Sequence, residues 1–169
     1  MRSVLSTAFL AAATLLTASI PLLAQDSSAA TSNQPVFLKP GDVVAPFEAK
    51  GIDGTEHKIT FPKGTTTILL FFSSGCPHCH KMIPMWNERF AERTGSQAVV
   101  GVIVDKAPEI FFQRVSILFP VLQSPGNALL NAFKVERVPI TLRVGAGGKV
   151  EDIGVGELDG IRLGQLFKP

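Results

Sequence analysis

The chain has 169 residues and a formal net charge of +2, with 16 Lys and Arg against 14 Asp and Glu. Because the basic residues form no run, the composition does not favour nucleic-acid binding. Beyond the N-terminal segment about 135 residues remain without an internal repeat, which suits one domain with one core.

The first 24 residues are expected to export the protein. Arg2 precedes an uncharged segment, residues 3–25, that is rich in Leu, Ala and Thr. The pattern predicts a signal peptide cut near Ala24, or an uncleaved anchor, because a bilayer span needs about 20 apolar residues. Residues 25–34 have the composition of a flexible linker, and residues 35–169 form the expected domain. We therefore expect a location in the periplasm or at the outer face of the cytoplasmic membrane.

Within the domain, hydrophobic periodicity predicts alternating strands and helices. In chain order these are a hairpin over 47–59, a buried strand over 65–72, a helix over 77–93, a buried strand over 98–104, a helix over 108–114, an extended segment over 119–122, a helix over 127–133, a hairpin with strands over 140–144 and 149–155, and a helix over 159–167. This order is typical of an α/β sandwich with parallel core strands and an antiparallel edge.

The only two cysteines, Cys76 and Cys79, lie where a buried strand is expected to meet a helix. A disulfide that closes so short a loop stabilises a fold little, which disfavours a purely structural bridge. The spacing fits dithiol–disulfide exchange, whereas His80 completes a Cys-x-x-Cys-His string of the kind that attaches c-type haem. Open α/β sheets place reactive groups at such a junction, so exchange is favoured.

The start of a helix favours a thiolate. A free thiol, with an ordinary pKa near 8.5, is mostly protonated at neutral pH. The unpaired N–H groups and the macrodipole at a helix N-terminus favour negative charge on Cys76, and His78 can add a hydrogen bond or a positive charge. Cys79, one turn on and facing the core, should stay a thiol. Cys76 is therefore the expected nucleophile and Cys79 the resolving residue of a redox-active disulfide.

The domain resembles the thioredoxin-like superfamily over most of its length. The resemblance rests on Gly41-Asp42, Ala45-Pro46-Phe47, the strand Ile68 to Phe72, Cys76-Pro77-His78-Cys79, Pro84, Val102 to Asp105, Phe119-Pro120-Val121-Leu122, Val138-Pro139 and Gly147-Gly148-Lys149. The opening hairpin and the Phe-Pro-Val-Leu segment are similar to the TlpA/ResA branch of exported or membrane-anchored thiol–disulfide oxidoreductases. The resemblance implies a redoxin that needs no cofactor. Its fold would be a three-layer sandwich with a central mixed sheet, flanking helices and an N-terminal β-hairpin.

The resemblance also implies roles around Pro139. In the superfamily a proline at this place is cis, packs against the reactive disulfide and presents neighbouring backbone to the partner chain. Arg137, beside this loop, either adds positive charge near the thiolate or faces solvent. The expected catalytic residues are then Cys76, Cys79, His78 and Pro139, and the expected substrate-binding residues are Val138, Pro77 and Arg137.

Some positions depart from the family pattern. Gly75 stands where an aromatic residue usually precedes the first cysteine, and Leu70 stands where thioredoxin has a buried acid that relays protons. The relay is thus absent or supplied by another group. Trp86 is not the motif tryptophan and is expected in the core.

The direction of electron flow is less constrained. The Pro-His dipeptide is the one carried by DsbA, a disulfide-forming oxidant, whereas the scaffold resembles a branch dominated by reductases. We favour a reductase that exchanges disulfides with protein substrates and is served by a membrane-bound electron donor or acceptor. A DsbA-like oxidase is the alternative.

Proteins of other functional classes could also use the two cysteines. A c-type haem carrier would bind iron through His80, but the motif follows a buried strand rather than lying in a helical domain. A Cu(I)-binding protein would use both thiols with His78 or His80. A peroxiredoxin shares the scaffold, but Ser73-Ser74-Gly75-Cys76 only loosely matches its Thr-x-x-Cys setting.

Overall fold

The computed structural model describes residues 36–168. The expected signal peptide or anchor at residues 1–24 and the linker at residues 25–34 lie outside these described residues. Among the helices within them, none is both long and apolar enough to cross a membrane.

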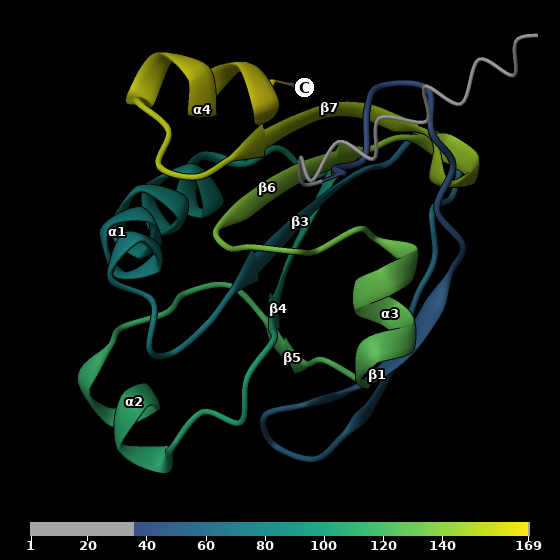
Figure 1. Cartoon of the computed structure of the whole chain (residues 1–169). Coiled ribbons are helices and arrows are strands. Elements are labelled where there is room, and N and C mark those ends of the chain that lie inside the picture. Colours follow the sequence, from purple (N-terminus) through teal and green to yellow (C-terminus); the bar gives the residue numbers. More distant parts are fainter. Residues whose placement is uncertain (1–35, 169) are drawn as a thin grey trace, which may run out of the picture. The chain divides into compact units, whose positions relative to one another are not determined.

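The strands and helices follow one another along the described chain in the order that the periodicity predicts (Figure 1). The elements are β1 (Phe47–Gly51), β2 (Glu56–Ile59), β3 (Thr66–Phe72), α1 (Pro77–Glu92), β4 (Gln97–Ile103), α2 (Glu109–Arg114), β5 (Val121–Gln123), α3 (Asn127–Ala132), β6 (Ile140–Val144), the short 3₁₀ helix η1 (Ala146–Gly148), β7 (Val150–Val155) and α4 (Gly160–Leu166).

One mixed sheet holds all seven described strands in the order β2-β1-β5-β4-β3-β6-β7. β3, β4 and β5 are parallel, and α1 connects β3 to β4. The sequence predicted one antiparallel edge, but both sides of the parallel core are antiparallel, because β1 pairs with β5 and β6 pairs with β3. Periodicity identifies a strand but not its neighbour, and the β1–β2 pair joins the sheet through β5.

β3 is buried on both faces and separates two hydrophobic clusters. Ile68, Leu70 and Phe72 face a cluster built with α1, α2 and α4, whereas Leu69 and Phe71 face a cluster that includes Leu129 of α3. Successive side chains of a strand point to opposite faces, so one apolar run supplies both clusters. Figure 1 shows the result: α1, α2 and α4 lie on one side of the sheet and α3 on the other.

Trp86 is fully buried, as expected of a core residue. Its indole N–H donates to Oγ1 of Thr141 on β6 at 3.0 Å, and no described buried side-chain nitrogen or oxygen lacks a partner. Pro84 lies inside α1, whose buried face carries Cys79, Met82, Ile83 and Trp86. The first of the two cysteines precedes this helix, so packing of α1 against β3 fixes the position of the pair.

Candidate active site

Cys76 is the N-cap of α1, and Pro77 is the first residue of the helix. The strand β3 ends at Phe72, so the cysteine pair begins where a central strand gives way to a helix, as the sequence predicts. The backbone N–H of Cys79 donates to Sγ of Cys76 at 3.2 Å. Side-chain acceptance of an N–H at a helix start is the usual capping arrangement, and it favours negative charge on the sulfur.

The two thiols differ in environment. Cys76 is partly exposed, whereas Cys79 is 0 % exposed and lies in the cluster beneath α1. Burial raises the pKa of Cys79 to about 12, and the hydrogen bond with Cys76 and the negative charge of Asp105 act in the same direction. A hydrogen bond from the Ser73 N–H opposes this effect. Cys79 is therefore held as a thiol behind its more accessible neighbour.

The Val138–Pro139 peptide bond is cis, as the resemblance implied. The Cys76 thiol donates to the Val138 carbonyl at 3.7 Å, a contact between residues 62 positions apart in the sequence. Pro139 is buried and immediately precedes β6. The antiparallel pairing of β6 with β3 brings this loop to the end of β3, beside the thiol.

His78 is exposed and contacts a carboxylate rather than a cysteine. Its Nδ1 shares a hydrogen bond with Oε1 of Glu157, in the loop after β7. The same oxygen accepts a hydrogen bond from Nζ of Lys81 at 2.9 Å. Hydrogen bonds from Lys81 and His78 lower the pKa of Glu157, so this carboxyl is ionised at neutral pH. The sequence expectation was that His78 adds a hydrogen bond or a positive charge at Cys76, and the hydrogen bond that its Nδ1 makes is with Glu157.

Three other positions that the sequence singled out are Arg137, His80 and Gly75. Arg137 is exposed, and its guanidinium lies over the ring of Phe37 at 5.4 Å from the centroid. His80 is exposed on α1, and its Nε2 pairs with the Ser74 carbonyl at 2.7 Å. A Cβ added to Gly75 would meet no atom within 4 Å, so the departure from the usual aromatic residue leaves open space there.

Asp105 is a site neighbour that the sequence reasoning did not assign. Its carboxylate accepts hydrogen bonds from the backbone N–H of Ser74, at 2.9 and 3.1 Å, and from the Ser74 hydroxyl at 2.6 Å. Desolvation opposes its ionisation, but the hydrogen bonds outweigh it and the pKa of Asp105 is lowered. Leu70, at the position of the thioredoxin acid, is fully buried and apolar. The available signal for Asp105 was its position just after the second buried strand, next to the end of β3.

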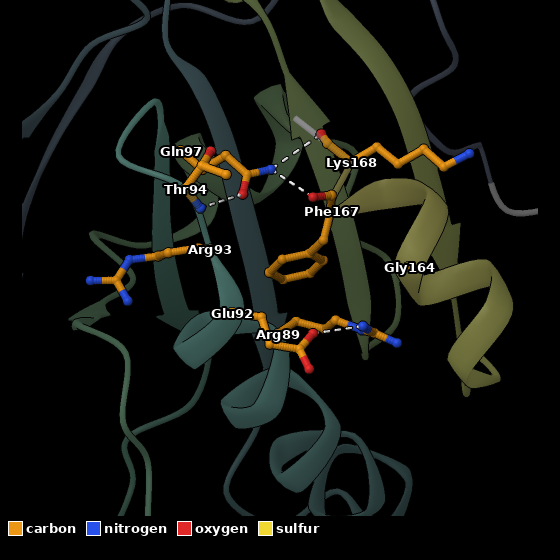
Figure 2. A pocket seen from close by; sticks show the side chains of 8 residues that line it. All are labelled: Arg89, Glu92, Arg93, Thr94, Gln97, Gly164, Phe167 and Lys168. Carbon is orange, nitrogen blue, oxygen red and sulfur yellow. Dashed lines mark hydrogen bonds and ion pairs between the residues drawn. The ribbon is translucent and has the colours of Figure 1, made fainter.

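A surface hollow lies at the other end of α1 (Figure 2). Its lining includes Arg89 and Glu92 from the last turn of the helix, which form an ion pair at 2.7 Å. Gln97, at the start of β4, donates to the carbonyls of Phe167 and Lys168. The 16 residues of α1 span about 24 Å, so this hollow is separate from the cysteine pair and holds no sulfur.

Metal ligands are not gathered at the site beyond the cysteine pair. Within residues 36–168, no group of three or more His, Cys, Asp or Glu side chains has the spacing to hold a metal ion. Nδ1 of His78 and Nε2 of His80 are each engaged with an oxygen. Either ring would have to break such a contact to bind a metal through that atom.

The fold and the paired thiols define a thiol–disulfide oxidoreductase with a thioredoxin-like fold. The AhpC/TSA family model matches residues 40–153, and the chain belongs to this family. It is 27% identical over 123 residues to thiol-disulfide oxidoreductase ResA of Geobacillus thermodenitrificans, a match that covers 70% of each chain. It is 27% identical over 130 residues to sporulation thiol-disulfide oxidoreductase A of Bacillus subtilis, covering 72% of this chain and 77% of that protein.

Solved structures show the same fold. A Chlorobium tepidum protein provisionally assigned as thiol:disulfide interchange protein DsbE superposes with a TM-score of 0.67 at 27% identity, over 76% of this chain and 95% of that one. StoA from Bacillus subtilis superposes with a TM-score of 0.64 at 24% identity, over 75% of this chain and 98% of that one. The thioredoxin-like assignment from sequence is confirmed.

Proposed function

We propose that the protein is a disulfide reductase of the cell envelope that acts on protein substrates through Cys76 and Cys79. The observation that carries the proposal is the unequal pair: a partly exposed thiol at a helix N-cap and a fully buried thiol one turn behind it. Such inequality lets one sulfur meet the substrate while the other completes the exchange.

The proposed exchange begins with attack of the Cys76 thiolate on a substrate disulfide. A Cys76–substrate sulfur bond forms, the substrate S–S bond breaks, and the other substrate sulfur leaves as a thiolate. Cys79 then gives up its proton, which the released substrate thiolate can accept, and its sulfur attacks Sγ of Cys76. The Cys76–Cys79 bond forms, the Cys76–substrate bond breaks, and the second substrate sulfur leaves as a thiolate that takes a proton from water. The products are a substrate dithiol and a Cys76–Cys79 disulfide, so the substrate gains two electrons and the protein loses two.

The cis-proline loop supports a role in substrate binding. The Val138 carbonyl already accepts a hydrogen bond from the Cys76 thiol, so a chain docked at this sulfur meets the Val138 backbone. Pro77, at the first turn of α1, is exposed on the same approach. We assign Val138 and Pro77 to the substrate surface, with Pro139 holding the loop against the pair. Arg137, which is exposed next to Val138 and whose guanidinium lies over Phe37, is kept as an outer substrate contact.

The envelope location rests on the N-terminal sequence. The uncharged segment after Arg2 favours export with cleavage or anchoring near Ala24. Oxidised Cys76–Cys79 must be reduced again, so a dithiol electron donor at the membrane completes the cycle. Its protein substrates would meet the enzyme in the same oxidising compartment.

Two measurements test the proposal. With a disulfide-bonded test protein, Cys79→Ser should trap a mixed disulfide through Cys76, whereas Cys76→Ser should trap none. Equilibration with glutathione should give a potential near that of thioredoxin, about −270 mV. A potential near −120 mV, together with oxidation of a reduced test protein, would support the oxidase alternative. Peroxide consumption by Cys79→Ser would support a peroxidase instead.

A further inference from the structure

The turn after β7 places a carboxylate beside the cysteine motif. The backbone N–H of Gly156 donates to the Pro139 carbonyl at 2.8 Å, and the N–H of Leu158 donates to Sδ of Met82 on α1 at 3.3 Å. Gly156 has φ +84, a left-handed conformation that glycine adopts without strain. Glu157, between these two anchored residues, is thereby held between the cis-proline loop and α1.

Glu157 connects two side chains of the first helical turns. His78 and Lys81 are three residues apart in α1, so they lie on one face of the helix. Both meet the same carboxylate oxygen, Oε1 of Glu157. No other described carboxylate forms an ion pair with either side chain. His78, Lys81 and Glu157 therefore form a cluster at the first turns of α1, close in sequence to Cys76.

The cluster bears directly on the redox balance of the pair. Positive charge near the first cysteine stabilises its thiolate, and a stabilised thiolate makes the disulfide form more oxidising. A carboxylate at the same place has the opposite effect, because it cancels part of that positive charge. The Pro-His dipeptide alone predicts an oxidant, but its histidine here is paired with an anion.

We propose that Glu157 is a positioning residue that engages His78 and cancels the charge of Lys81, and thereby keeps the Cys76/Cys79 pair reducing. The inference rests on the reductase function proposed above and deepens it. Glu157 acts through the charge next to the sulfur and makes no contact with the reacting atoms. It also accounts for a DsbA-like dipeptide on a scaffold that resembles reductases.

The test compares redox equilibria of purified variants with glutathione at pH 8, above the range in which histidine ordinarily titrates. Glu157→Gln should shift the equilibrium constant about fivefold toward the dithiol form, which corresponds to about 20 mV for a two-electron couple. Alkylation of Cys76 should also become faster in this variant, because more of the thiol is ionised. Glu157→Asp, which keeps the charge, should show less than half of the shift.

Charge-matched controls separate this effect from a general change in net charge. Glu48→Gln removes an exposed carboxylate from β1, which is three strands away from β3 in the sheet, and should shift the constant less than twofold. The double variant Glu157→Gln/Lys81→Gln should have a redox equilibrium constant within twofold of that of the unsubstituted protein. The proposal is wrong if Glu157→Gln shifts the constant less than twofold or if the double variant keeps the full shift. If the proposed reductase function is wrong, the unsubstituted protein itself will show it, whereas the role of Glu157 is tested by the difference between variants. The two failures are therefore distinguishable.

Discussion

Replacement of Cys76 by serine allows the reactivity of the buried Cys79 thiol to be measured alone. In Cys76→Ser, Cys79 is the only thiol, and burial, the main cause of its raised pKa, persists. The full shift of the native pair, from the reference value 9.0 to a pKa of about 12, would leave about a thousandfold less thiolate at neutral pH. The part of this shift that comes from the hydrogen bond and charge of Cys76 is absent in the variant. A more basic thiolate is also more nucleophilic, by about 15- to 30-fold over this range. Cys79 should therefore react more slowly than a small free thiol, by at most about 30- to 60-fold through its lower ionisation, and burial of the sulfur slows it further.

The assay follows the reaction of a small disulfide reagent with each single-cysteine variant in the reduced state. In native buffer Cys76→Ser should react slowly, and Cys79→Ser, whose remaining thiol is partly exposed, should react faster. In concentrated urea both rates should approach that of the free thiol, because the environment of Cys79 is lost. A native-state rate for Cys79 within about threefold of the free thiol would refute the assigned roles.

Two further predictions concern the residues that hold the site. Asp105→Asn should destabilise the reduced protein at neutral pH, measured by urea unfolding. A carboxyl whose folded pKa is lowered stabilises the fold at pH values above its unfolded pKa, which is near 4. The difference in unfolding free energy between Asp105→Asn and the unsubstituted protein should therefore narrow as the pH falls below about 4. A difference that stays constant from pH 7 to pH 3 would contradict the role of the Asp105 charge. Trp86→Phe should cost about 1–3 kcal/mol, because the buried Thr141 hydroxyl loses its donor. Leu118→Ala, at a residue 56% exposed, should stay within about 0.5 kcal/mol, and equal losses in the two variants would argue against a specific Trp86–Thr141 contribution.

Local sequence predicted the placement of the cysteine pair well. The apolar run before Cys76 and the Pro77 that follows it place the motif at a strand–helix junction, and the structure has this junction. The 3.6-residue period of the helix predicted that Cys79 faces the core, and it is fully buried there. These features depend on residues within one turn or one strand, which is the range over which sequence patterns are informative.

The sequence did not predict which distant acidic residues lie beside the cysteine motif. Glu157 contacts His78 across 79 positions, and Asp105 contacts Ser74 across 31. Glu157 belongs to no motif, Asp105 enters only as the end of the segment Val102 to Asp105, and each is one of 14 Asp and Glu residues in the chain. The sequence therefore predicted that His78 adds a hydrogen bond or a positive charge at Cys76, and it did not predict the carboxylate of Glu157 that the fold brings to His78.

The sequence by itself determined the strand and helix order, the buried face of α1 and the position of the two cysteines at a strand–helix junction, because these follow from periodicity and local spacing. Tertiary structure alone decided which strand lies beside which, that the Val138 carbonyl meets Cys76, and that Glu157 meets His78 and Lys81. The physical reason is that strand pairing and loop placement result from burial of the whole core. Charges that are distant in the chain become neighbours only after that burial is complete.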